Sequence, residues 1–472
     1  MRLFLKASTS VLLLGAAVHA ATPTVTSVSP KVLPLGRATR VEISGSDLAG
    51  PSLWLNFPAS TRWLDTNDAM RVACEITPEN EAGIGAFRVF STNGVSALQL
   101  LAVVRTSGNT TIHEGVIREE GANFHHRVML KKGERIVAEV IANRLGSTLD
   151  PVVRLLDSAH KLELAFNDDF TFGGRDARVS FVAPKEAEYV IELRDVAYTG
   201  SDKHRYQLLI GNAQQPSLPW LSPGADPNFP SESEPNNAPE QANTLATHLR
   251  AEFALARDKD LFRIHVAEKG KLLVKSASRS IGSPCDVRLR LIRADQSVVA
   301  FGTVPHTEDT FLKADVDAGE YLLEATELTG KGAPGLHYQL SVQAWLPSFT
   351  LTTETDSISP AGGDTITIPV KAQRVDFDGE ITLAVAGLPR GVEVDGALIP
   401  AKKSEAELKL KFPSTLPVGV WNELRISGSA KWQERQLTAV ASTRLALKKA
   451  FPLLHIPESP LTSMIPCVIK AK

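Results

Sequence analysis

Two stretches of the chain repeat each other: EYVIELRDVAYTGSDKHRYQL at 188–208 and EYLLEATELTGKGAPGLHYQL at 320–340. In both, a tyrosine follows the opening glutamate, and a second tyrosine begins the closing Tyr-Gln-Leu at the same separation. Apolar and polar residues alternate in the first part of each copy, which is typical of a β-strand with one buried face. Such regular spacing indicates two homologous structural units that follow one another in the chain.

The repeat extends upstream, where LGSTLDPVVRLLDSAHKLELAF matches IGSPCDVRLRLIRADQSVVAF. The paired residues are Gly146 and Gly282, Asp150 and Asp286, Phe166 and Phe301, Tyr189 and Tyr321, and Tyr206 and Tyr338. We therefore expect one β-sandwich at 106–213 and a second at 231–346. The proline-rich segment 214–230 between them predicts an extended, semi-stiff linker.

Alternating apolar residues recur outside the repeat, separated by short turn-forming stretches such as SGSDLAG and GLPRGVEVDG. The residues predicted to be buried in four such runs are Val41 and Ile43; Leu162, Leu164 and Phe166; Ile366, Ile368 and Val370; and Leu408, Leu410 and Phe412. Long amphipathic helical patterns are absent after the first twenty residues. The sequence thus predicts an all-β fold of tandem β-sandwiches.

The N-terminal residues 1–20, MRLFLKASTSVLLLGAAVHA, have two basic residues ahead of a short apolar run and end on small residues. This pattern predicts a signal peptide, and the apolar run is too short for a membrane span. The mature protein is expected to be secreted or periplasmic. The formal net charge is -2, with 51 Lys and Arg against 53 Asp and Glu, so nucleic acid is not an expected partner.

The three cysteines, Cys74, Cys285 and Cys467, lie far apart in the sequence and predict neither a disulfide scaffold nor a zinc site. Cys74 alternates with Val72 and Ile76, which predicts a small buried residue in a strand. Nothing in the sequence groups a nucleophile, a base and an orienting residue, so the chain is not expected to be an enzyme.

The repeated unit resembles the bacterial pre-peptidase C-terminal (PPC) domain. The matching motifs are EPNN at 234–237, DKDLF at 258–262, AFNDD at 165–169, the Gly-Ser before Asp150 and Asp286, and the GEY and YQL of the second copy. The first copy departs from the family at Ala187, where the glycine of GEY is absent. The resemblance implies a jelly-roll-like β-sandwich related to the collagen-binding domains of bacterial collagenases.

The flanking segments resemble other bacterial modules. VTSVSPKVLPLGRATRVEISGSDLAG, which begins at Val25, is similar to immunoglobulin-like domains of the transcription-factor type, and we assign such a domain to 21–105. The segment from Phe377 looks like the immunoglobulin-like module that often follows PPC domains, and we assign that domain to 347–447. The remaining 448–472 is expected to be an irregular tail.

Acidic residues alternate in two places in the second copy. In SESEPNN, the side chains of Glu232, Glu234 and Asn236 would point the same way from an extended backbone, and Asp258 and Asp260 alternate in the same manner. Four carboxylates and an amide are a suitable oxygen donor set for calcium. A solvated acidic linker followed by a turn is the alternative interpretation.

The resemblance to collagen-binding domains implies a calcium role for six residues: Glu232, Glu234, Asn236, Asn237, Asp258 and Asp260. Asn237 is neutral where many relatives carry aspartate, which would weaken the site. The first copy has adjacent Glu119 and Glu120, and no Asp-x-Asp before Phe124, so we expect it to have lost the site.

Together these features predict a secreted, non-enzymatic bacterial protein that binds or spaces other molecules, braced by calcium. Its expected partner is an extracellular protein, a polysaccharide or the cell envelope. The alternative is an accessory or targeting subunit for a separately encoded secreted peptidase or other hydrolase.

Overall fold

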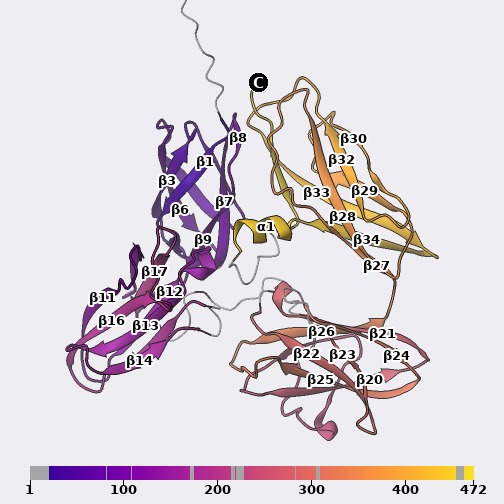
Figure 1. The fold of residues 1–472 in the computed structure, drawn as a ribbon, viewed down its shortest axis with the longest axis horizontal. Helices are drawn as coiled ribbons and strands as arrows, with labels where there is room; N and C mark the ends of the chain where they lie inside the picture. Colours follow the sequence, from indigo (N-terminus) through magenta and orange to yellow (C-terminus); the bar gives the residue numbers. More distant parts are fainter. Residues whose placement is uncertain are drawn as a thin grey trace, which may run out of the picture.

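The computed structural model describes residues 21–472 except 81, 108, 171–174, 214–217, 219–227, 282, 304–308 and 453–461. The predicted signal peptide, most of the predicted linker and Gly282 of the repeat therefore lie outside the described residues. The fold is all-β: the strands form four groups of sheets in chain order (Figure 1), and α1 (Arg444–Ala450) is the one α-helix among the described residues. None of the helices in the described ranges is long and apolar enough to cross a membrane.

The first group is a two-sheet sandwich, with sheet orders β1-β3-β6-β5 and β2-β9-β7-β4 and with β8 paired to β7. Its strands are β1 (Thr24–Ser29), β2 (Val32–Pro34), β3 (Thr39–Ser46), β4 (Ser52–Leu55), β5 (Ala59–Asp65), β6 (Arg71–Pro78), β7 (Gly83–Ser91), β8 (Gly94–Val95) and β9 (Gln99–Val104). Val41, Ile43 and Cys74 lie in its core, as their alternation predicts. Burial raises the pKa of the Cys74 thiol to about 12.

The second group, which is the first repeat, contains β10 (Thr111–Val116), β11 (Phe124–Leu130), β12 (Arg135–Ile141), the 3-10 helix η1 (Asn143–Leu145), β13 (Pro151–Asp157), β14 (Glu163–Asn167), β15 (Arg178–Val182), β16 (Ala187–Asp195) and β17 (Arg205–Gly211). The third group, which is the second repeat, contains η2 (Pro239–Gln241), β18 (Asn243–Thr244), β19 (His248–Glu252), β20 (Lys259–Val266), β21 (Gly270–Ala277), η3 (Arg279–Ile281), β22 (Val287–Arg293), β23 (Val298–Phe301), β24 (Phe311–Val316), β25 (Gly319–Glu327) and β26 (His337–Ala344).

The two repeats have the same topology. Sheet β10-β17-β12-β15 corresponds to β19-β26-β21-β24, and β11-β16-β13-β14 corresponds to β20-β25-β22-β23, to which β18 is added at the edge. The first tyrosine of each repeat makes the same hydrogen bond: the Tyr189 hydroxyl donates to the Lys185 carbonyl at 2.9 Å, and the Tyr321 hydroxyl donates to the Asp317 carbonyl at 3.0 Å. The repeated sequence therefore specifies a repeated sandwich.

One predicted burial pattern is wrong. Leu162 and Phe166 are 58% and 48% exposed, whereas the alternation in KLELAF predicts that both are buried. The strand β14 lies at a sheet edge, and its pairing with β13 shifts register between Leu155 and Leu156. Because of that irregularity, Leu164 and its neighbour Ala165 are the residues of this strand that pack against the core.

The fourth group forms one nine-stranded sheet, ordered β30-β32-β28-β27-β34-β33-β29-β31 with β35 paired to β33, around a single core. Its strands are β27 (Ser348–Thr352), β28 (Thr365–Val375), β29 (Ile381–Ala386), β30 (Glu393–Asp395), β31 (Leu398–Ile399), β32 (Glu405–Lys411), β33 (Trp421–Trp432), β34 (Arg435–Ser442) and β35 (Ile465–Val468). The predicted residues Ile368, Val370, Leu408, Leu410 and Phe412 are buried there, and Ile366 is partly buried.

The segment 448–472 is not an irregular tail where it is described. The strand β35 pairs antiparallel with β33, and its Ile465 and Cys467 lie in the core of the fourth group. Just before this segment, Leu447 of α1 packs into a cluster with Val32 of the first group and Ile141 of the first repeat. The sequence does not reveal this because the stabilising contacts come from distant parts of the chain.

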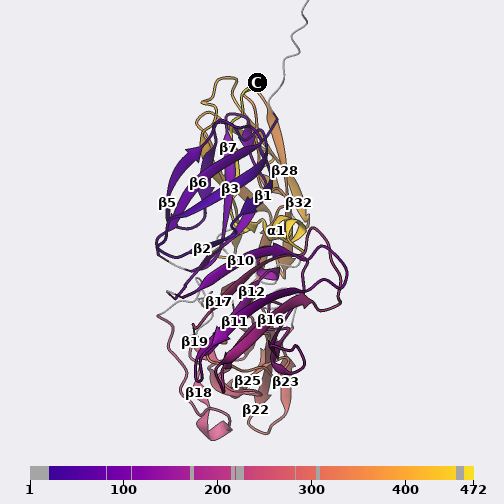
Figure 2. The same cartoon turned by 90° about the vertical axis from the view of Figure 1, so that its left-hand side faces the viewer.

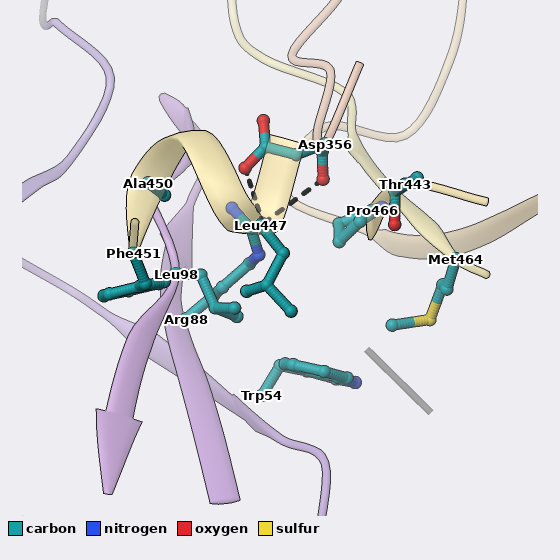
Figure 3. Close-up of a pocket in the computed structure, with 10 residues that line it drawn as sticks. All are labelled: Trp54, Arg88, Leu98, Asp356, Thr443, Leu447, Ala450, Phe451, Met464 and Pro466. Carbon is teal, nitrogen blue, oxygen red and sulfur yellow. Dashed lines mark hydrogen bonds and ion pairs between the residues drawn. The ribbon is translucent and has the colours of Figure 1, made fainter. Parts of the chain in front are cut away.

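The fourth group also contacts the first group directly (Figure 1), with α1 close to the junction. Arg88 is 4% exposed and donates to the Asp356 carboxylate at 2.9 Å and to the Ser96 carbonyl at 2.7 Å. Figure 3 shows Arg88, Asp356 and Trp54 among the residues that line a cavity of about 20 Å³. The indole of Trp54 stacks on that of Trp421, with ring centroids 5.3 Å apart.

Candidate metal site in the second repeat

The segment that contains SESEPNN lies across both sheets of the second repeat. The backbone N–H of Glu232 donates to the Arg250 carbonyl of β19 at 2.9 Å. Further along, the Asn236 carbonyl accepts the N–H of Leu261 in β20 at 3.1 Å. Since β19 and β20 belong to different sheets, these two bonds attach one short segment to both layers of the sandwich.

Two carboxylates of this segment and one of β20 lie close together. Glu232, Glu234 and Asp260 each offer an oxygen within 4.8 Å of the others, and the group could hold a metal ion. Asn236 lies beside them: its Nδ2 donates to Glu232 Oε2 at 2.9 Å, and its backbone N–H donates to Glu234 Oε2 at 2.9 Å. The alternation of residues 232, 234 and 236 thus does bring their side chains together.

Two oxygens of this group are buried without a partner. Asn236 and Asp260 are 0% exposed, and neither Asn236 Oδ1 nor Asp260 Oδ1 has a hydrogen-bond donor. The other oxygen of Asp260 accepts the hydroxyl of Tyr338. Buried polar atoms in native proteins almost always have a partner, and a cation bound at the carboxylates would be a partner for these two oxygens.

The electrostatics of the cluster oppose full ionisation. Burial, reinforced by the charge of Glu232, raises the pKa of Asp260 to about 9. Burial also raises the pKa of Glu232 to about 7, with a smaller contribution from Glu234, and raises the pKa of Glu234. At neutral pH the cluster therefore holds protons that a divalent cation could replace.

The remaining predicted residues lie outside this three-carboxylate group. Asn237 is exposed on the surface. Asp258 is buried, and its Oδ1 accepts the N–H of Lys259 at 3.1 Å, while its charge raises the pKa values of the three clustered carboxyls. The sequence did not predict that Tyr338 contacts this group, although its Tyr-Gln-Leu motif identifies the strand in which it lies.

The first repeat differs at the position of Asp260. In the second repeat, Asp260 is paired with Ala325 of β25, which is four residues after Tyr321. In the first repeat, the residue four positions after Tyr189 is Leu193 of β16, and its partner is Phe124. Phe124 therefore replaces Asp260, and its ring lies 5.7 Å from that of Tyr206, centroid to centroid. Where the first repeat is described, no group of three metal-binding side chains occurs.

No protein-family model matches the chain, and no curated protein matches it. Among solved structures, the pre-peptidase C-terminal domain of a collagenase from Bacillus anthracis is 20% identical over 23% of this chain and 100% of that chain, with a TM-score of 0.19. SGBP-B from a complex xyloglucan utilization locus in Bacteroides uniformis is 11% identical over 41% and 72% of the two chains, with a TM-score of 0.17. The ICAM-5 D1–D4 ectodomain fragment is 12% identical over 88% and 96%, with a TM-score of 0.15.

Proposed function

We propose that this chain is a secreted, non-enzymatic binding protein in which calcium braces the second repeat. The observation that carries the proposal is the cluster of Glu232, Glu234 and Asp260, in which Asp260 Oδ1 and the neighbouring Asn236 Oδ1 are buried without a partner. No hydrolytic or redox role is needed for such a site, because its position between a chain segment and two sheets suits a structural cation.

The donor set favours calcium over a softer metal. Glu232, Glu234, Asn236 and Asp260 would hold the ion, and all four offer oxygen, whereas zinc and copper sites usually include histidine or cysteine. Calcium accepts six to eight oxygens in flexible geometry, so water would complete the shell on the side of the exposed Glu234.

A bound cation would fasten the segment 231–237 to the second repeat. The ion would bridge carboxylates of that segment to Asp260 of β20, adding to the two backbone bonds already present. The direction in which the preceding linker leaves the sandwich would then be fixed. We infer that calcium sets the spacing of the modules, while recognition of a protein, polysaccharide or envelope component occurs elsewhere on them.

Thermal unfolding of the full-length protein, with millimolar calcium and with chelator, tests this proposal. At about 100 times its dissociation constant, calcium adds roughly 2.7 kcal/mol to the stability of the module that binds it. For a module of this size we expect the corresponding midpoint to rise by on the order of ten degrees. The Glu234→Gln protein should lose most of this shift and still fold, because Glu234 is exposed.

Glu268→Gln is the matched control, since Glu268 is exposed on the same repeat and does not belong to the cluster. Its calcium shift should equal that of the parent. If the thermal unfolding curves with and without calcium superimpose, the proposal that calcium binds here is wrong. Hydrolysis of a peptide or glycan panel that disappears on substitution of one acidic residue would contradict the non-enzymatic role.

A further inference from the structure

Two histidines of the first repeat lie against each other at one end of its sandwich. His113 is in β10 and His126 is in β11, and these strands are the edges of two different sheets. In Figure 2, β10 lies just below the first sandwich, and β11 lies further down in the same repeat. The two ring centroids are 4.6 Å apart, with the ring planes tilted by 54°.

Strand pairing shows that both histidines are on the inward faces of their sheets. His113 is paired with Leu208, and His126 is paired with Ile191. Both partners belong to the core of the first repeat, and directly paired residues have their side chains on the same face of a sheet. Both imidazoles are only half-buried, so they meet between the two sheets and are still accessible from solvent.

The second repeat has apolar residues at the same two positions. Strand pairing with the repeated motifs equates His113 with Leu249 and His126 with Phe262. Leu249 and Phe262 are 4% and 0% exposed and belong to the core of the second repeat. There β18 pairs with β20 beside Phe262, whereas among the strands described for the first repeat none pairs with the outer edge of β11. The first repeat therefore has two imidazoles where the second has a covered part of its core.

The separation of the two rings fits two ligands of one metal ion. A zinc–nitrogen bond is about 2.0–2.1 Å long, and the ring centroid lies about 1 Å beyond the nitrogen. Two imidazoles on one ion, at ligand–metal–ligand angles of about 90–110°, therefore have centroids roughly 4.5–5 Å apart. The observed 4.6 Å between His113 and His126 is within this range.

The surroundings of His113 favour the form of imidazole that binds metals. The Thr111 hydroxyl donates to the Ile210 carbonyl at 3.4 Å and accepts Nε2–H of His113 at 3.3 Å, which leaves the lone pair of Nδ1 for an ion. Burial lowers the pKa of His113, and the charge of His126 lowers it further, so the neutral ring is favoured.

A second histidine pair in the same repeat is engaged differently. The rings of His125 and His160 have centroids 5.1 Å apart, but Nε2 of His125 is hydrogen-bonded to the Glu192 carboxylate at 3.0 Å. His125 is adjacent to His126 in β11 and therefore lies on the opposite face of the sheet. It is a matched control for the inward-facing pair.

We propose that His113 and His126 bind one divalent transition-metal ion of the class that prefers imidazole, such as Cu²⁺ or Zn²⁺. Water completes the coordination on the open side of the two strands. This site goes beyond the proposed calcium brace, because it lies in the other repeat, takes a softer metal and shares no residue with the acidic cluster.

Isothermal titration of the full-length protein with Cu²⁺ and with Zn²⁺, in millimolar calcium, tests the inference. We expect one ion to bind per chain at this pair, with Cu²⁺ bound more tightly than Zn²⁺. His113→Leu and His126→Phe introduce the residue types of the second repeat, and each should weaken Cu²⁺ binding about tenfold or more because it removes one of two protein ligands. Paramagnetic resonance with less than one equivalent of Cu²⁺ should show two imidazole nitrogens in the parent and fewer in each variant.

His125→Gln should bind Cu²⁺ like the parent. Thermal unfolding in chelator establishes that each variant folds, and His113→Asn, which keeps a polar side chain, provides a second test at that position. Glu234→Gln should lose the calcium-dependent thermal shift and keep the Cu²⁺ site, so failure of this inference and failure of the calcium proposal are distinguishable.

Failure of the parent to bind Cu²⁺ stoichiometrically would overturn the inference. Copper binding that His113→Leu and His126→Phe both retain would also overturn it, as would binding that is lost in His125→Gln. A parent copper spectrum without imidazole nitrogen would have the same consequence.

Discussion

Substituting Asp260 by asparagine should separate the pH dependence of the second repeat from its fold. Asp260 is 0% exposed, and burial with neighbouring acids raises its pKa to about 9, from an ordinary value of 3.8. Asparagine has nearly the same shape, can accept the Tyr338 hydroxyl, and does not ionise.

The direction in which stability changes with pH follows from the direction of the pKa shift of Asp260. Because the pKa of Asp260 is higher in the folded state than in the unfolded state, its contribution to stability is complete below about pH 4 and is lost as the pH rises toward about 9. Within that window the loss is about 1.4 kcal/mol per pH unit. Between pH 5 and pH 8 the parent without calcium should therefore lose about 4 kcal/mol, and Glu232, with a pKa of about 7, adds to the loss in the lower part of the range.

The Asp260→Asn protein should lack the part of this pH dependence that comes from the ionisation of Asp260. In chelator at pH 8, about four pH units above the ordinary pKa of 3.8, we expect it to be more stable than the parent by about 6 kcal/mol, reduced by on the order of 1 kcal/mol if the amide makes poorer hydrogen bonds. In calcium the order should reverse, because the variant loses a carboxylate ligand and with it the calcium stabilisation.

Calorimetry of the full-length protein at pH 5 and pH 8, with calcium and with chelator, measures these changes. Hydrogen exchange of the Leu261 amide reports on the same region, because that N–H donates to the Asn236 carbonyl at 3.1 Å. Glu268→Gln should track the parent under all conditions. Parallel pH profiles for parent and Asp260→Asn would refute the reasoning, and so would full calcium stabilisation of the variant.

Two further predictions concern other parts of the molecule. Arg88→Met should weaken the contact between the first and fourth groups by about 1–3 kcal/mol, since it removes the bonds to the carboxylate and the backbone carbonyl of Asp356. Small-angle scattering should then show a larger radius of gyration. The thiols of Cys74, Cys285 and Cys467 should resist alkylation in the native protein at neutral pH, because burial raises each pKa to about 12; rapid labelling of any of them before unfolding would contradict this.

The sequence alone was sufficient to predict the all-β class and the tandem repeat. Period-two alternation identifies a strand wherever one face packs on a core, and Val41, Ile43, Leu408 and Leu410 are buried as that rule requires. Alternation also brought Glu232 and Glu234 to one side of their segment, because it depends only on local backbone geometry.

Only the tertiary structure decided which residues meet across strands. Strand register places Phe124, and not an acid, at the first repeat's equivalent of Asp260, and strand pairing brings Tyr338 to Asp260 from a distant part of the chain. The same holds for β35, whose pairing with β33 gives regular structure to a segment without a local signal. The contact between His113 and His126 exists only because edge strands of two sheets pack together, and the spacing of residues within one strand carries no information about such packing.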